Sequence, residues 1–151
     1  MNESDLIEGV FPVPHTLYSQ KTGSIMDGIQ GTLSRFTSAF SLLDLDGMMI
    51  CYANDATAFF PIAHHASFLD GKVEIREAFA KVIAKIRAAG FSSIKLELED
   101  VKIHRFGDAA IATFHIRDGD LSRRTLVLRR SHDDWFIQHL HASNAPLEET
   151  Q

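Results

Sequence analysis

Two histidines near the carboxyl end of the chain, His139 and His141, are the residues whose type and spacing most clearly suggest chemistry. They fall within residues 135–143, where apolar and polar residues alternate as they do in a strand. Successive side chains of a strand point to opposite faces, so Trp135, Ile137, His139 and His141 are expected to share one face. An imidazole titrates near neutral pH and can act as a general acid or base. The pair is therefore the first candidate for a catalytic site.

The same histidines allow a metal-binding reading and a structural one. A His-x-His pair on a strand places two imidazoles on one side, within reach of a single ion, and His64, His65 and His115 add further nitrogen ligands. This spacing is unspecific, and we expect neither a metal nor another cofactor. In the structural reading each imidazole is hydrogen-bonded to a neighbouring strand or to Tyr52. The alternation of residues 109–117 leaves open whether His115 points inward, and His64 and His65 are expected in an exposed loop.

The elements that must position these residues follow from hydrophobic periodicity and turn chemistry. Apolar residues recur at helical spacing from an N-cap pair, Ser24 and Asp27, to about residue 43, and again over residues 73–86 before Gly90. A short helix over residues 48–53 precedes a strand over residues 55–60, and residues 64–71 are expected to form a loop or short hairpin. Four more strands are predicted over residues 93–106, 109–117, 121–130 and 135–143, with turn sequences between them. Helices followed by an antiparallel meander predict an α+β fold in which the sheet curls around the helices.

Composition bounds the organisation of the chain. A length of 151 residues with 45% apolar residues is enough for one domain with its own core. Residues 1–23, with two prolines and no sustained period, are expected to form an arm, residues 24–145 the domain, and residues 146–151 a tail. Cys51 is the only cysteine, which excludes an intrachain disulfide, and it is expected to be buried. The acidic start shows neither a signal peptide nor a membrane span, so we expect a cytoplasmic protein.

Charge argues against nucleic acid or an anionic membrane as the main partner. The net charge is −5, and the 15 lysines and arginines are scattered along the chain. The one basic cluster comprises Arg123, Arg124, Arg129 and Arg130, interrupted by leucine and valine. A solvated strand edge or a set of salt bridges is the expected role of this cluster, with anion recognition as the alternative. Similarly, Asp55 is expected to cap a turn or to pair with Arg76.

Residues 52–61, Tyr-Ala-Asn-Asp-Ala-Thr-Ala-Phe-Phe-Pro, resemble the ketosteroid isomerase stretch Tyr-Ala-x-Asp-Ala-Thr-x-x-Asp-Pro. Arg35-Phe36, Asp44 and the helix at residues 75–79 after Gly71 fall where that family has similar residues. Residues 135–143 also resemble the Trp-x-Ile-x-His-x-His-x-Ser close of the polyketide-cyclase-like and nuclear transport factor 2-like group. The resemblance covers roughly residues 25–145. It implies a cone-shaped cystatin-like fold with an internal pocket, whose wall includes the face carrying His139 and His141.

Three departures from that family concern its catalytic groups. In the isomerase a carboxylate before the proline moves the proton, and a tyrosine and a protonated aspartate stabilise the dienolate. Here the corresponding positions hold Phe60, Phe36 and, near the aspartate, Leu126. Phenyl and isobutyl groups neither accept a proton nor donate a hydrogen bond, so we expect no steroid isomerase activity.

The resemblance therefore implies a small-molecule pocket protein that pairs through its sheet into a homodimer and binds a small apolar ligand. Two other functions stay open: a lyase, cyclase or isomerase that uses His139 or His141 with Tyr52 as hydrogen-bonding partner, and an oligomerisation module like the kinase association domains. An apolar pocket wall is expected from Phe59 together with the main lining residues, which are Phe36, Phe40, Tyr52, Phe60, His115, Leu126 and Trp135.

Overall fold

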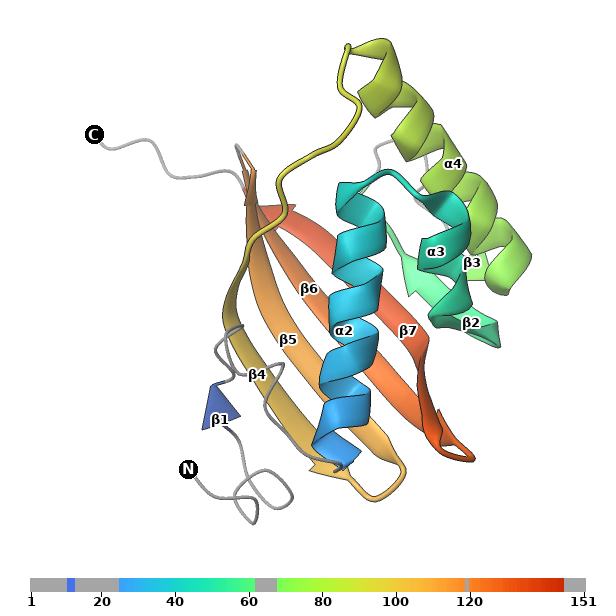
Figure 1. The fold of residues 1–151 in the computed structure, drawn as a ribbon, viewed down its shortest axis with the longest axis vertical. Coiled ribbons are helices and arrows are strands. Elements are labelled where there is room, and N and C mark those ends of the chain that lie inside the picture. The colour runs from blue at the N-terminus through green and yellow to red at the C-terminus, as the bar shows by residue number, and fades with distance from the viewer. Residues whose placement is uncertain (1–10, 13–24, 62–67, 119, 146–151) are drawn as a thin grey trace.

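The strands form one curved sheet, and the helices lie against one of its faces (Figure 1). The computed structural model describes residues 11–12, 25–61, 68–118 and 120–145. The elements in chain order are β1 (Phe11–Pro12), α2 (Ile25–Ser41), α3 (Leu45–Ile50), β2 (Tyr52–Phe59), β3 (Leu69–Asp70), α4 (Lys72–Ala88), β4 (Leu98–Phe106), β5 (Ala109–Asp118), β6 (Asp120–Ser131) and β7 (Asp134–Ala145). The predicted α+β class, with a curved sheet around helices, is confirmed.

The sheet has the strand order β1-β4-β5-β6-β7-β2-β3. Strands β4 to β7 form an antiparallel meander, and β2 joins its far edge by pairing parallel to β7. Two short strands extend the edges: β1 pairs with Lys102 and Ile103 of β4, and β3 pairs with Thr57 and Ala58 of β2. We call the face that packs against the helices the inner face and the opposite one the outer face.

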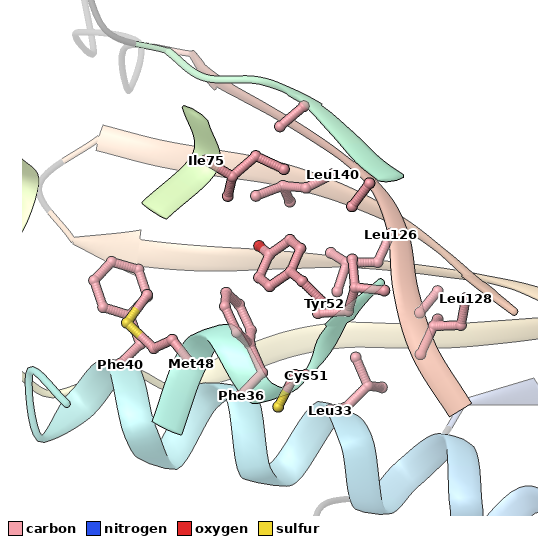
Figure 2. Close-up of a cluster of buried hydrophobic side chains, with 14 of the residues drawn as sticks. Leu33, Phe36, Phe40, Met48, Cys51, Tyr52, Ile75, Leu126, Leu128 and Leu140 are labelled. Atoms are coloured by element: carbon pink, nitrogen blue, oxygen red, sulfur yellow. The ribbon is translucent and has the colours of Figure 1, made fainter. Parts of the chain in front are cut away.

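Helix α2 packs on the inner face because its apolar residues recur at helical spacing. Ile29, Leu33, Phe36 and Phe40 form one buried stripe. The buried Thr32 side chain fixes the helix to β7, since its Oγ1 donates a hydrogen bond to the backbone oxygen of Trp135 at 2.8 Å. Together with Met48, Ile75 and the inner residues of the strands, this stripe forms the core shown in Figure 2.

Several element boundaries differ from the predicted ones for local reasons. Helix α3 begins at Leu45 rather than residue 48, because the Asp44 side chain accepts a hydrogen bond from the Gly47 N–H at 3.1 Å and so caps the helix. The strand predicted from residue 93 begins at Leu98. Residues before it are held at the end of α2 instead, where the backbone N–H of Ile94 donates to the Ser41 oxygen at 2.8 Å and the Ser41 hydroxyl donates back to Ile94 at 2.7 Å.

Some predicted features lie outside the described residues. These are the cap at Ser24, most of the arm and tail, and the loop that carries His64 and His65. Within the described helices, none is both long and apolar enough to cross a membrane.

Candidate functional site

A β-bulge in β7 decides which of its side chains face the helices. Leu128 of β6 is the Cα partner of Ile137, but its neighbour Val127 is the partner of His139, which leaves Gln138 as the extra residue. Before the bulge, Trp135 and Ile137 are buried on the inner face. After it, Leu140 and Ala142 are the buried residues, so His139 and His141 point to the outer face. The prediction that both histidines share a face with Trp135 and Ile137 is wrong.

The bulged residue is held by polar contacts from two other strands. Gln138 Nε2 donates to Asp55 Oδ1 on β2 at 3.0 Å, and Gln138 Oε1 accepts from Arg129 Nη1 on β6 at 3.4 Å. The hydrogen bond from Gln138 lowers the pKa of the Asp55 carboxyl. The predicted pairing of Asp55 with Arg76 is wrong, because Arg76 donates to Asp46 at 2.6 Å. Asp55 therefore helps to fix the register of β7 against β2.

On the outer face, His139 is bound to Thr57 rather than to Tyr52. Its Nδ1 lies 2.7 Å from Thr57 Oγ1 on the neighbouring strand. The Phe59 ring packs between the two histidines, with ring centroids 5.6 Å from His139 and 5.3 Å from His141. Burial, and secondarily the charge of His141, lowers the pKa of His139. At neutral pH, His139 is thus an uncharged ring that packs between Thr57 and Phe59.

The lowered pKa of His139 predicts how the free energy of unfolding depends on pH. In the unfolded chain a histidine takes up a proton near pH 6.5, whereas the folded state takes it up only at lower pH. As the pH falls from about 7 through this window, protonation favours the unfolded chain, and the free energy of unfolding decreases. We expect His139→Gln to flatten this decrease between about pH 7 and pH 5, as measured by urea unfolding at several pH values. The control is His104→Gln on β4, and an unchanged slope in His139→Gln would contradict the assignment.

His115, whose orientation the sequence leaves open, lies on the outer face. Its neighbours Phe114 and Ile116 are buried on the inner face, whereas His115 Nδ1 lies 2.9 Å from Asp100 Oδ2. The structure therefore places it away from the pocket wall to which it was assigned. Phe59 is likewise on the outer side, with 40% of its surface exposed.

The homodimer through the sheet stays a prediction, which light scattering tests directly.

On the inner side, five aromatic residues meet in one cluster. The ring of Phe79 on α4 lies 6.0 Å from Phe36, 5.5 Å from Phe40, 6.1 Å from Tyr52 and 4.7 Å from Phe60, measured between centroids. We call these five residues the aromatic cluster. Of the three positions that carry the isomerase reaction in the related family, two hold Phe36 and Phe60, which belong to the aromatic cluster. The third holds Leu126, which is completely buried on the inner face of β6. The cluster offers an apolar surface rather than an acid and a base.

Within this cluster the Tyr52 hydroxyl is the exception. The residue is 1% exposed, and its Oη has no hydrogen-bond partner among the described residues. Figure 2 shows the hydroxyl directed away from α2, among the apolar side chains of the interior. Burial raises the pKa of Tyr52 above its ordinary value, while the positive charge of Arg124 opposes that rise. The hydroxyl is therefore a protonated donor without an acceptor, which is costly in a core.

Arg124 is a cation on the inner face, where the sequence pattern led us to expect a solvated or salt-bridged side chain or, as the alternative, an anion-binding one. On β6 it shares the inner face with Ser122, Leu126 and Leu128, and it lies between its Cα partners Phe114 and Ala142. Its Nε donates to Ser122 Oγ at 2.8 Å, and burial lowers the pKa of its guanidinium. The expected solvated or salt-bridging role holds for Arg130, which pairs with Asp108 at 2.8 Å, but it is wrong for Arg124. The sequence indicated this orientation, because Arg124, Leu126 and Leu128 occupy every second position of the strand and therefore share one face.

A groove opens where β2 and β7 separate at their carboxyl ends. It has a volume of about 460 Å³ and is lined by Phe59, Phe60, Pro61, His141, Ala142, Ser143 and Asn144. Phe60 belongs both to this lining and to the aromatic cluster, so the groove borders the interior. Its wall residues Ala142 and Asn144 are the Cα partners of Arg124 and Ser122. The groove is therefore one strand away from Arg124 and Ser122 of β6, which do not themselves line it.

A second groove, of about 380 Å³, lies at the other end of β2 and includes Asp55, Lys72, Arg129 and Gln138. These residues are largely committed to the contacts that hold the bulge. In the part of the chain that the structure describes, no three His, Cys, Asp or Glu side chains come together as a metal site would require.

Comparisons with known proteins agree with this architecture. An NTF2-like protein of unknown function from Pseudomonas putida KT2440 is similar in structure, with a TM-score of 0.68 and 25% identity over 83% of this chain and 90% of that one. A protein from Streptomyces avermitilis, provisionally described as a dehydratase of the NTF2-like family, gives a TM-score of 0.67 with 19% identity, covering 80% of this chain and 96% of that one. A protein of unknown function with a cystatin-like fold from Nostoc punctiforme gives 0.65 with 14% identity over 85% and 96% of the two chains. A search of curated proteins found no match.

The match to a family model is the more decisive result. The model of the SnoaL-like domain matches residues 29–148, which span every described element from α2 to β7 except the first residues of α2. This range also contains the aromatic cluster, Arg124 and the groove. The chain therefore belongs to the SnoaL-like domain family, within the NTF2-like and ketosteroid isomerase-like superfamily.

Proposed function

We propose that this protein binds a small, largely apolar molecule in the groove between the ends of β2 and β7, and that it is not a steroid isomerase. The observation that carries the proposal is the continuity of the groove with the aromatic cluster through Phe60. A concave site that is mainly apolar, with a few polar groups at its inner end, is typical of small-molecule sites. The groove's volume of about 460 Å³ falls within the range of such sites.

The side chains at the three reaction positions support the proposal that the protein is not a steroid isomerase. Phe36 and Phe60 are engaged with Phe79 in the aromatic cluster, and Leu126 is fully buried. None of the three can hold or move a proton. Within residues 25–61, 68–118 and 120–144, the inner polar groups described above are a guanidinium and hydroxyls. These groups donate hydrogen bonds, and none of them is a base that could abstract a proton.

Binding is tested with 2-naphthamide, an uncharged probe with two fused rings. We expect saturable binding by calorimetry, with amide chemical-shift changes concentrated at residues 59–61 and 141–144. Ala142→Leu narrows the groove and should weaken binding about tenfold or more, because a well-packed site tolerates added bulk poorly. The matched control is Ala88→Leu at the exposed end of α4, which should bind as the wild type does. Shift changes confined to other surfaces, or no saturation, would refute the proposal.

Catalysis by a histidine is the second candidate, and one observation favours it: His141 is exposed and lines the groove. His139 is less suited, since Thr57 occupies its Nδ1. If a ligand found by the binding test is converted to product, the catalytic hypothesis expects His141→Ala to abolish conversion while leaving binding intact. Unchanged conversion in that variant would exclude this role.

A further inference from the structure

We propose that Arg124 is an anion anchor, and that the molecule bound in the groove carries a carboxylate that Arg124 holds together with the Tyr52 hydroxyl. This inference deepens the proposed function and depends on it, since the same groove receives the apolar body of the ligand. Its basis is a cation and an unused donor that both face the inner side of the sheet.

The first step of the argument is the position of Arg124. Consecutive arginines on β6 point to opposite faces: Arg123 is exposed and donates to Ser143 Oγ at 3.2 Å, whereas Arg124 is partly buried on the inner face. An inward arginine must be surrounded by apolar groups unless a partner is present, and burying an unpaired charge is costly. Phe114 and Ala142, its Cα partners on the two flanking strands, are both buried and apolar.

The second step is the lack of a carboxylate for this guanidinium. Three arginines of the described chain have one, since Arg76 pairs with Asp46, Arg117 with Glu99 and Arg130 with Asp108. For Arg124, the described residues provide only the neutral Ser122 hydroxyl, which accepts from Nε. The two terminal nitrogens of the guanidinium keep their hydrogen atoms, and their planar fork matches the two oxygens of a carboxylate.

The third step is the Tyr52 hydroxyl, an independent sign that an acceptor is missing from this interior. It is almost fully buried and donates to no described group. Tyr52 on β2 and Arg124 on β6 both face the inner side from the two strands that flank β7, and the positive charge of Arg124 opposes the rise in the pKa of Tyr52. An anion between them would satisfy both donors, and desolvation by the aromatic cluster would strengthen each hydrogen bond.

The groove is the path by which a ligand would approach Arg124 and Tyr52. Ala142 and Asn144 line the groove and are the Cα partners of Arg124 and Ser122 on the adjacent strand. A ligand whose rings rest against Phe60 and Ala142 can therefore extend one carboxylate toward β6. This geometry selects an aromatic or alicyclic monocarboxylate over an uncharged molecule of the same shape.

The test compares 2-naphthoate with 2-naphthamide, which have the same rings and nearly the same shape but differ in charge. In the wild type, calorimetry should show that naphthoate binds about 10- to 100-fold more tightly, as expected for charge-assisted hydrogen bonds to a desolvated guanidinium. Arg124→Gln should remove this preference, so that the variant binds naphthoate no more tightly than it binds naphthamide. Arg123→Gln, the neighbouring outward arginine, is the matched control and should keep the full preference.

A second variant protects the test against misfolding of Arg124→Gln. Tyr52→Phe removes the unpartnered hydroxyl, so it should fold at least as stably as the wild type and still lose part of the naphthoate preference. Equal affinity for the two probes in the wild type, with naphthamide bound in the groove, would overturn the anion anchor and leave the proposed function standing. Failure of both probes to bind would overturn the proposed function itself. A preference that survives in both Arg124→Gln and Tyr52→Phe would place the anion elsewhere and also overturn the inference.

Discussion

Replacing Leu126 with alanine is expected to lower the free energy of unfolding by about 2–5 kcal/mol. Leu126 is completely buried on the inner face of β6, between its Cα partners Ala112 and Leu140. Alanine would remove apolar atoms and leave a cavity that the paired strands cannot easily close, since their backbones are fixed by ladder hydrogen bonds. Urea unfolding at neutral pH measures the change.

The matched control is Leu42→Ala, which removes the same atoms from a side chain that is 65% exposed. A surface substitution of this kind should change the free energy of unfolding by no more than about 0.5 kcal/mol. Equal losses in the two variants would show that residue 126 is not in the core. The comparison also tests the inner face of β6, from which the position of Arg124 is argued.

Gly28→Ala is expected to destabilise the protein by about 1–3 kcal/mol, although alanine is the better helix former. A Cβ at position 28 would lie 2.6 Å from Trp135 Cδ1 and 3.1 Å from its Nε1. The indole has little freedom to move away: the residue is buried, Thr32 binds its backbone oxygen, and the Arg105 guanidinium lies 5.8 Å from the ring centroid. Thermal unfolding should show the loss.

Gly31→Ala in the same helix should have the opposite sign. The nearest atom to a Cβ at position 31 is Arg35 Nη1, at 3.3 Å, and the end of a flexible side chain can shift. Alanine there should raise the free energy of unfolding by up to about 1 kcal/mol through helix propensity. If both alanine variants stabilise the protein, close contact between α2 and Trp135 is contradicted.

Much of the fold could be predicted from the sequence because its elements are strongly periodic. The apolar stripe from Ile29 to Phe40 and the turn sequences between the last four strands identify a long helix and a meander whatever the tertiary context. The element boundaries were less predictable where a side-chain hydrogen bond sets the end of a helix, as that of Asp44 does at the start of α3. The resemblance of residues 52–61 to ketosteroid isomerase added the way these elements assemble.

The candidate site could be predicted only in part. Phe36, Phe40 and Phe60 were assigned to a pocket wall from residue type and resemblance; they meet in the aromatic cluster, and of the three Phe60 lines the groove. The orientation of His139 and His141 could not be predicted, because strict alternation assumes an uninterrupted ladder and the bulge at Gln138 depends on partners from β2 and β6. The inward position of Arg124, by contrast, was predictable from alternation alone, although the expected role of the arginine cluster was a solvated edge or salt bridges, with anion recognition as the alternative.

The bulge at Gln138 has a consequence for how this family member can vary. Beyond it, even-numbered positions of β7 set the shape of the interior and odd-numbered positions set the outer surface, so a substitution can alter one without touching the other. Deletion of Gln138 itself would remove the extra residue and leave the pairing on both sides in register, with Leu140 and Ala142 still inside and both histidines still outside. The carboxyl-terminal strand can therefore diverge by point replacement on either face, and loss of the bulged residue would remove its contacts with Asp55 and Arg129 rather than rearrange the interior.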